Sequence, residues 1–285
     1  MTNDKIIENN GIILSLVSQY INECADAIDE GMVKETVSSC GVSEEEAYKI
    51  LLSGCLDIYS KKELREYINL GVKRLDADVY RNDEYYRNIK LSDIKGKNWS
   101  IEIKSYKPYE LFCRNDLKQL PDGRIIPQLG YFPEEYVYPC ILQDNREWML
   151  ITPNEMDTSV DAIKRSRGRV LTYGLGMGYF AYMASNKKEV TSVTIVENDK
   201  EVISLFNEYI LPQFPNKDKI EIICGDAIFH ASDMKVSREK KFDFVFADIW
   251  HDVSDGVGIY EIFKGLERHD TEYSYWIEDT IKCYL

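Results

Sequence analysis

The feature that most constrains the fold is an alternation of strand-like and helical segments between residues 169 and 248. Four runs have the composition of buried strands, and the segments 177–186 and 199–214 between the first three of them suit helices. Strands that alternate with helices build a doubly wound, mostly parallel sheet, and ligands bind at the carboxyl edge of such sheets. The four runs are Arg169–Tyr173, Ser192–Glu197, Lys219–Cys224 and Phe242–Asp248.

Residues from about 5 to 75 are predicted to form a small helical bundle. Apolar side chains recur there at spacings of three and four, and Ser43 with Glu46 forms a capping box at the start of one helix. We expect the apolar stripes to form a core, with a surface for a partner or a homodimer as the alternative. The stripes comprise Ile12, Leu16 and Ile21, and Ala47, Ile50, Leu51 and Leu56.

Short alternating runs between about residues 98 and 152 predict a small β subdomain. Its strands are expected at 99–104, 136–142 and 147–152, with a hairpin turn at 143–146, while the proline- and glycine-containing segment 121–133 is expected to form turns. A helix should follow at about 156–167. The sequence is thus divided into a helical accessory region (1–95), the β subdomain (96–153) and an α/β cofactor domain (154–285).

The charge distribution bears on the class of partner. Most of the formal net charge of −14 lies at the two ends, since the first 50 residues hold ten acidic and three basic residues. No stretch is basic enough to follow a phosphate backbone, so nucleic acid is disfavoured and a small-molecule substrate is favoured over a protein. The apolar runs are shorter than the ~20 residues of a membrane helix. With seven cysteines and no CxxC pair, we expect a cytoplasmic protein without a membrane segment.

Three glycines mark the junction between the first strand and the helix after it. Gly174, Gly176 and Gly178 form a GxGxG pattern, and glycine allows a ligand to approach the backbone closely. The next strand ends in Glu197, 23 positions after Gly174, where a carboxylate can accept hydrogen bonds from both ribose hydroxyls. Dinucleotide sites require a glycine where this chain has Tyr179. The pattern therefore predicts a nucleotide-type cofactor site other than a dinucleotide site.

With Gly225-Asp226 after the third strand, this pattern resembles that of class I S-adenosylmethionine (SAM)-dependent methyltransferases, which have a Rossmann-like fold. The resemblance covers about 80 of the 285 residues. It implies SAM as the cofactor, with the glycines beneath its methionine part, Glu197 at the ribose and Asp226 at the adenine. The implied cofactor-binding residues are Tyr173, Gly174, Gly176, Gly178, Glu197, Asn198, Asp226 and Ala227.

The sequence departs from the family in two places. The acidic residue that is frequent two positions before the first glycine is Thr172 here. Only 35 residues, His251 to Leu285, remain after the fourth predicted strand and the two residues that follow it. The sheet is therefore expected to be C-terminally shortened, with fewer strands at its C-terminal end than is usual in the family. One further strand is predicted, around residues 273–277.

The run Asp248-Ile-Trp-His-Asp252 follows the fourth strand, where the acceptor should meet the sulfonium. It resembles the Asp-x-Trp-x-Asp run of catechol O-methyltransferases, which implies Asp248 and His251 as catalytic residues. A histidine suits proton removal, because its unperturbed pKa is ~6.5. The metal pair of that family has no clear match apart from Glu278-Asp279, so no metal is expected. The segment 152–158 is expected to border the pocket.

The sequence thus predicts a SAM-dependent methyltransferase that acts on a small molecule or a protein by in-line methyl transfer. One alternative is a spermidine-synthase-like aminopropyltransferase, a group that shares the glycine loop, the acidic end of the second strand and an N-terminal β element. The consecutive glycines and the Asp-Ser/Ala-x-Asp-Pro signature of that group are absent here. A second alternative is a SAM-binding module without catalysis.

Overall fold

The computed structural model describes residues 2–96, 98–144, 146–237, 239 and 241–285. The chain forms two compact units: Met1–Tyr80 with Ser105–Val137, and Arg81–Lys104 with Tyr138–Leu285. The second unit is discontinuous in sequence and carries the GxGxG pattern. Within the described ranges, no helix has both the length and the apolar character required to cross a membrane. The three-part division at residues 95 and 153 stays a prediction.

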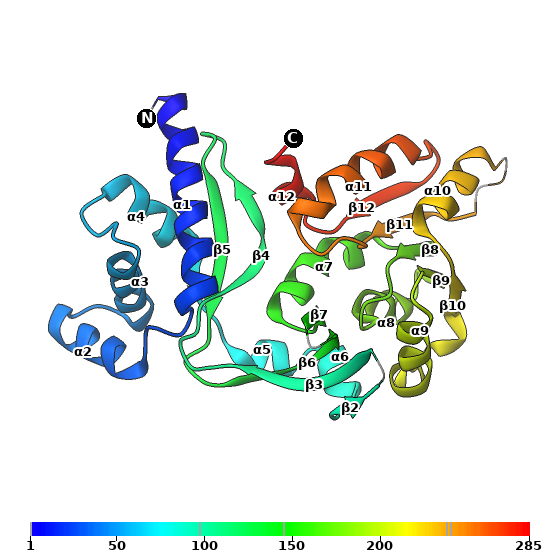
Figure 1. The fold of residues 1–285 in the computed structure, drawn as a ribbon, viewed down its shortest axis with the longest axis horizontal. Helices are drawn as coiled ribbons and strands as arrows, with labels where there is room; N and C mark the ends of the chain where they lie inside the picture. Colours follow the sequence, from blue (N-terminus) through cyan, green and yellow to red (C-terminus); the bar gives the residue numbers. More distant parts are fainter. Residues whose placement is uncertain (1, 97, 145, 238, 240) are drawn as a thin grey trace. The chain divides into compact units, whose positions relative to one another are not determined.

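The first unit combines four helices with a three-stranded sheet of order β1-β5-β4 (Figure 1). The capping box at Ser43 and Glu46 is confirmed at the start of α3, where each residue bonds the backbone of the other. The elements are α1 (Asn3–Cys24), α2 (Glu30–Cys40), α3 (Glu44–Cys55), α4 (Lys62–Gly71), β1 (Val72–Arg74), β4 (Phe112–Gln119) and β5 (Ile125–Tyr131).

The buried face of α1 differs by about one position from the predicted stripe. Ile13, Val17 and Tyr20 are buried, whereas Ile12, Leu16 and Ile21 are partly buried beside them. Polar contacts contribute to this orientation, because the buried hydroxyl of Tyr67 donates to the Asn10 side chain at 2.8 Å. The helical core itself is confirmed.

The expectation that residues 121–133 form only turns is wrong, because β5 occupies most of this segment. Ile126, Leu129 and Tyr131 of β5 are buried, and β1 pairs with its second half in parallel from the Val72–Leu129 pair onward. Pro127 precedes that pairing and lies where the ladder to β4 is irregular, between the pairs formed by Ile126 and Gln128. Proline is tolerated at such an interruption because its missing N–H costs no ladder bond.

The second unit begins with short elements and a sheet of order β2-β3-β6-β7. The predicted strands are confirmed, and β6 and β7 form an antiparallel pair. The predicted turn at 143–146 includes residue 145, which lies outside the described residues. The elements are α6 (Glu84–Asn88), β2 (Ile94–Lys95), β3 (Trp99–Tyr106), β6 (Tyr136–Gln143) and β7 (Arg146–Leu150), preceded by α5 (Ala77–Arg81) at the boundary of the two units.

A five-stranded parallel sheet of order β10-β9-β8-β11-β12 forms the centre of the second unit (Figure 1). All four pairings are parallel, which confirms the predicted doubly wound α/β fold. The strand predicted near residue 273 is confirmed as β12, beside β11. The strands are β8 (Gly168–Tyr173), β9 (Val190–Glu197), β10 (Ile220–Cys224), β11 (Phe244–Ala247) and β12 (Glu272–Tyr275).

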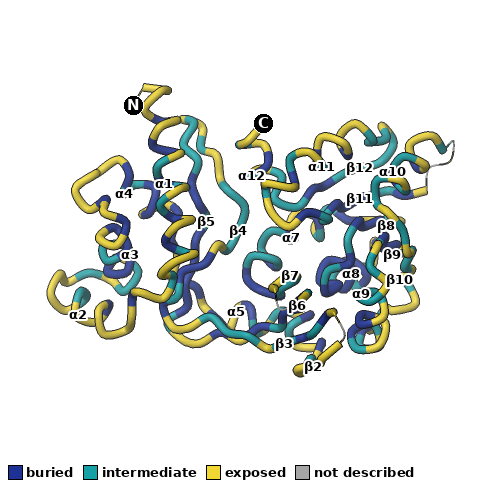
Figure 2. Tube along the Cα trace, viewed as in Figure 1, coloured by how far each residue is buried: buried dark blue, intermediate teal, exposed yellow. Residues whose placement is uncertain are grey.

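Helices cover both faces of this sheet, so β8 and β11 are buried on both sides (Figure 2). Tyr173 and Val245 pack on the face of α10 and α11, whereas Phe244 and Phe246 contact Phe180 of α8 on the other. The chain after α9 continues as a π-helical and a 3-10 turn up to Gln213. The helices are α7 (Pro153–Arg165), α8 (Tyr179–Ser185), α9 (Lys200–Leu205), α10 (Ala227–Val236), α11 (Val253–Leu266) and α12 (Glu278–Lys282).

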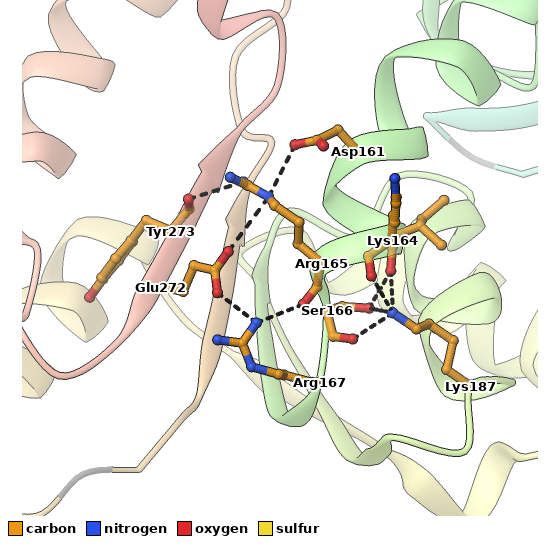
Figure 3. Close-up of polar contacts among 9 residues, drawn as sticks. Asp161, Lys164, Arg165, Ser166, Arg167, Lys187, Glu272 and Tyr273 are labelled. Atoms are coloured by element: carbon orange, nitrogen blue, oxygen red, sulfur yellow. Dashed lines mark hydrogen bonds and ion pairs between the residues drawn. The ribbon is translucent and has the colours of Figure 1, made fainter.

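A lysine caps the C-terminus of α7, close to the start of β8 (Figure 3). The ammonium group of Lys187 donates to the carbonyl oxygens of Ile163 at 2.6 Å, Lys164 at 2.8 Å and Ser166 at 2.6 Å. Carbonyl groups in the last turn of a helix have no partner within it, and a cation there is favourable. Lys187 therefore ties the end of α7 to the loop after α8.

Candidate functional site

A cavity of about 520 Å³ lies at the carboxyl edge of the parallel sheet. This volume is within the range of small-molecule sites. The loops after four of the strands contribute to its lining: the glycine loop after β8, and the residues that follow β9, β10 and β11. Thr152, Asn154 and Glu155 at the start of α7 also line it, as expected for the segment 152–158.

Each glycine of the pattern has positive φ, but the surroundings differ. Gly176 has open space where a side chain would project, and it lines the cavity. A side chain at Gly174 would overlap the carbonyl oxygen of Asp248, and one at Gly178 would overlap the ring of Phe206. Gly174 and Gly178 thus allow close packing within the protein, while Gly176 leaves room for a ligand.

Glu197 organises the glycine loop as well as facing the cavity. Its Oε2 atom accepts a hydrogen bond from the Leu175 N–H at 3.2 Å, and Oε1 accepts one from the Asp199 N–H at 2.8 Å. A carboxylate has about four lone-pair positions, so these bonds leave acceptor capacity for a ligand. The predicted ribose contact is therefore sterically and chemically available.

Asp226, Ala227 and Asn198 line the cavity beside Glu197. Asp226 is the N-cap of α10, and its Oδ1 accepts from the Phe229 N–H at 2.9 Å. Oδ1 thus caps the helix, and Oδ2 is left to accept a hydrogen bond from a ligand. Trp99 extends this side of the cavity, since its indole N–H donates to Asp199 at 3.2 Å.

Two carboxyl groups, Asp248 and Glu155, line the cavity near the end of β11. Asp248 is held by the sheet, because its N–H donates to the carbonyl of Tyr173 at 2.9 Å. Burial raises the pKa of Asp248 to about 7. Burial also raises the pKa of Glu155 well above its ordinary value, and the charge of Asp248 adds to this rise. Two such groups titrate as a pair, so the pair retains a proton near neutral pH.

His251 lies at the exposed rim of the cavity. Its ring is 5.2 Å from the ring of Trp148, and its Nδ1 atom is 3.8 Å from Asp252. The backbone N–H of His251 donates to Asp255, the residue that completes the capping box of α11. Asp248 and His251, the predicted catalytic residues, are thus brought to the same cavity.

Tyr173 and Gly178 are the two predicted cofactor residues that do not line the cavity. The Tyr173 side chain is fully buried in the core formed with α10 and α11. Its hydroxyl is 3.1 Å from Nδ1 of His230, and burial raises its pKa. The alternation of side chains along β8 explains this placement, because Tyr173 points to the face opposite that of Thr172.

Sequence reasoning did not single out several residues of the cavity. Glu155 was included only as part of the segment 152–158, and nothing in the sequence distinguished it from the other acids of the chain. All four tryptophans of the chain line the cavity. Trp99 and Trp148 come from the small sheet, so only the tertiary structure brings them to the glycine loop. These tryptophans are Trp99, Trp148, Trp250 and Trp276.

The charge of the cavity is one-sided. Six carboxyl groups line it, and no lysine or arginine does so in the part of the chain that the structure describes. No group of three metal-ligating side chains is found among these residues. Glu278 accepts a hydrogen bond from Tyr260 at 2.8 Å and is not in the lining. The carboxyl groups are Glu155, Glu197, Asp199, Asp226, Asp248 and Asp255.

The sequence matches no protein-family model and no curated protein. Among solved structures, similarity was found to an O-methyltransferase from Bacillus cereus in complex with SAH, with 18% identity and a TM-score of 0.30. That match covers 39% of this chain and 50% of the other. A spermidine synthase from Thermotoga maritima is 15% identical with a TM-score of 0.38, and the match covers 65% of this chain and 56% of the other.

A spermidine synthase in complex with the transition state analogue AdoDATO is 14% identical with the same TM-score of 0.38. The chain thus spans about half the length of each of these proteins. TM-scores this low do not distinguish between the two classes of transferase. The assignment of the site therefore depends on its own residues.

Proposed function

We propose that this protein is a SAM-dependent methyltransferase whose acceptor is a small molecule. The observation that carries the proposal is that one cavity unites Gly174 and Gly176, the acidic residues Glu197 and Asp226, and the buried carboxyl Asp248. The glycines, Glu197, Asp226 and Asp248 lie at or just after the carboxyl ends of four different strands of one sheet. SAM carries a positive sulfonium, and a cavity lined by acids attracts cations.

In the proposed reaction the acceptor atom attacks the methyl carbon of SAM in line with the C–S bond. That bond breaks with its electron pair moving to sulfur, and the acceptor loses a proton. Asp248 is the proposed recipient of this proton, because a base with a pKa near 7 is half ionised at neutral pH. Four tryptophans line the cavity, and their proposed role is to shield the reactants from water and to align them. His251 at the rim is the second candidate for the proton.

The first test of this proposal is binding of SAM measured by calorimetry. Replacement of Glu197 by alanine removes a charged hydrogen-bond acceptor worth roughly 1.5 to 3 kcal/mol. SAM affinity should therefore fall by on the order of ten- to a hundredfold. Glu221→Ala is the matched control, because Glu221 lies on the neighbouring strand β10 and outside the cavity lining. Equal SAM affinity of the wild type and Glu197→Ala would disprove the assignment.

Catalysis is tested by transfer of a labelled methyl group from SAM to small molecules in a cell extract. Labelled product is expected from the wild type and not from Asp248→Asn. Tight binding of SAM without any transfer would instead support a binding module.

One observation favours aminopropyl transfer as a second candidate function. No lysine or arginine is found among the described lining residues to pair with the carboxylate of SAM, and decarboxylated SAM lacks that group. The same cavity has the acidic character suited to an amine acceptor. The affinities for SAM and decarboxylated SAM distinguish the two functions. A clear preference for decarboxylated SAM would reject methyl transfer in favour of aminopropyl transfer.

A further inference from the structure

The glycine loop is supported by a segment that precedes it by about 90 residues and belongs to the same unit. Tyr85, in α6, is buried, and its ring contacts those of Tyr179 and Tyr182 at centroid distances of 5.5 and 5.4 Å. The Tyr85 hydroxyl donates a hydrogen bond to the carbonyl oxygen of Met177, the residue between Gly176 and Gly178. α6 thus contacts both the glycine loop and helix α8.

One peptide group of the loop is held by hydrogen bonds at both its oxygen and its N–H. The Met177–Gly178 peptide presents its oxygen to Tyr85, and its N–H donates to the carbonyl of Leu175 at 2.9 Å. The glycines on both sides of Met177 have positive φ. Glycine imposes little resistance to rotation of a peptide plane. The bond from Tyr85 therefore adds a restraint from outside the loop to the internal bond with Leu175.

The same peptide is linked to the predicted ribose carboxylate. Leu175, whose carbonyl accepts from Gly178, donates its own N–H to Oε2 of Glu197 at 3.2 Å. The other oxygen of Glu197 accepts from the Asp199 N–H. The Tyr85 hydroxyl is thus connected to the carboxylate in the cavity through two hydrogen bonds of the loop, which are joined by the backbone of Leu175.

We infer that Tyr85 is a positioning residue, which holds the Met177–Gly178 peptide and, through it, the Glu197 carboxylate in the geometry that binds the cofactor. The neighbouring contacts hold α6 in place for this role. Asp83, the N-cap of α6, accepts a hydrogen bond from the Tyr179 hydroxyl at 3.1 Å. Asn88 donates to the hydroxyl of Tyr182 at 2.8 Å. The claim that this geometry binds the cofactor rests on the proposed SAM site. The claim that Tyr85 holds the loop peptide does not depend on that proposal.

The test compares Tyr85→Phe with Tyr182→Phe. Both variants lose one hydroxyl from the packed rings between α6 and α8, but only the first loses a bond to the glycine loop. The first readout is amide hydrogen exchange of Leu175 and Gly178, followed by NMR in the ligand-free protein. Exchange of both amides should be faster in Tyr85→Phe and unchanged in Tyr182→Phe. Circular dichroism and thermal unfolding verify that both variants are folded.

The second readout is the dissociation constant for SAM. It should rise about three- to tenfold in Tyr85→Phe, because one buried acceptor of the loop is left without its donor. In the transfer reaction, the KM for SAM should rise with kcat unchanged. Tyr182→Phe should leave both quantities at the wild-type values.

Unchanged exchange at Leu175 and Gly178 in Tyr85→Phe would overturn the inference, whatever the cofactor. An equal loss of SAM affinity in both variants would also overturn it, because the effect would then be one of packing alone. Faster exchange in Tyr85→Phe, together with no SAM binding by the wild type, would support the positioning of the loop and reject the proposed function.

Discussion

The carbonyl oxygen of Asp248 occupies the space into which a side chain at Gly174 would project. The backbone just after β8 and the backbone just after β11, where the candidate catalytic carboxyl is attached, are therefore in contact at the cavity. Gly174→Ala is expected to unfold the unit or shift β11, because the added methyl group meets backbone and the residue has a φ of +93°. Thermal unfolding should show a large loss of stability or no folded protein.

Gly176→Ala is the informative counterpart. Its φ of +52° is also left-handed, so strain should cost about 1 to 2 kcal/mol, but no atom lies in the way of the methyl group. The variant should fold and lose affinity for SAM, since the methyl group enters the cavity. A folded Gly176→Ala protein with wild-type SAM affinity would show that the ligand does not approach this glycine.

Asp248 gives the protein a characteristic pH dependence of stability. Burial raises the pKa of its carboxyl to about 7, so the folded state binds a proton more tightly than the unfolded state. The contribution of Asp248 to the free energy of unfolding is then fully present below pH ~4 and is lost as the pH rises through the folded-state pKa of about 7. Asp248→Asn should remove this loss and raise the free energy of unfolding at pH 8 by up to about 4 kcal/mol relative to the wild type, because each pKa unit corresponds to about 1.4 kcal/mol.

The measurement is chemical denaturation of the two proteins between pH 4 and 8. The difference between their free energies of unfolding reports on Asp248 alone, because the surface carboxylates contribute equally to both proteins. One of these is Asp270, whose pKa is lowered to about 2 by the hydrogen bond from Arg268. A difference that does not change with pH would contradict the raised pKa. Glu155→Gln should alter the same difference curve, because the charge of Asp248 contributes to the raised pKa of Glu155.

Lys187 is expected to be important for stability and not for binding. Lys187→Met removes the donor for three carbonyl oxygens at the end of α7 and should lower the free energy of unfolding by about 1 to 3 kcal/mol. Lys188→Met is the matched control, because the adjacent Lys188 is exposed and equal in charge. Similar unfolding curves for the two variants would refute the capping role.

The parallel sheet could be predicted from the sequence because its strands alternate with helices and because the central strands β8 and β11, which are buried on both sides, consist mainly of apolar residues. β4 and β5 gave no such signal, since β4 contains Arg114, Asn115 and Asp116 and β5 contains Pro127. β5 pairs with β4 and also with β1, a strand of three residues at the end of a helix. Short strands of this kind are defined by their partners and not by their own composition.

The candidate site was predictable to the extent that it follows the strands. Gly174, Glu197, Asp226 and Asp248 each occupy the residue at or just after a strand end, so topology alone brings them together. The contributions of Tyr85, Trp99 and Trp148 depend on side-chain packing between segments that are far apart in sequence. The cofactor roles of the individual residues stay predictions until SAM binding is measured.

The bond between Tyr85 and Met177 joins two segments that are synthesised at different times. The two residues are 92 positions apart, and ribosomes add about 5 to 20 residues per second. Tyr85 therefore leaves the ribosome roughly 5 to 20 s before its partner. During that interval the ring of Tyr85 has neither Tyr179 nor Tyr182 to pack against, so α6 can pack on α8 only after residue 182 has been synthesised.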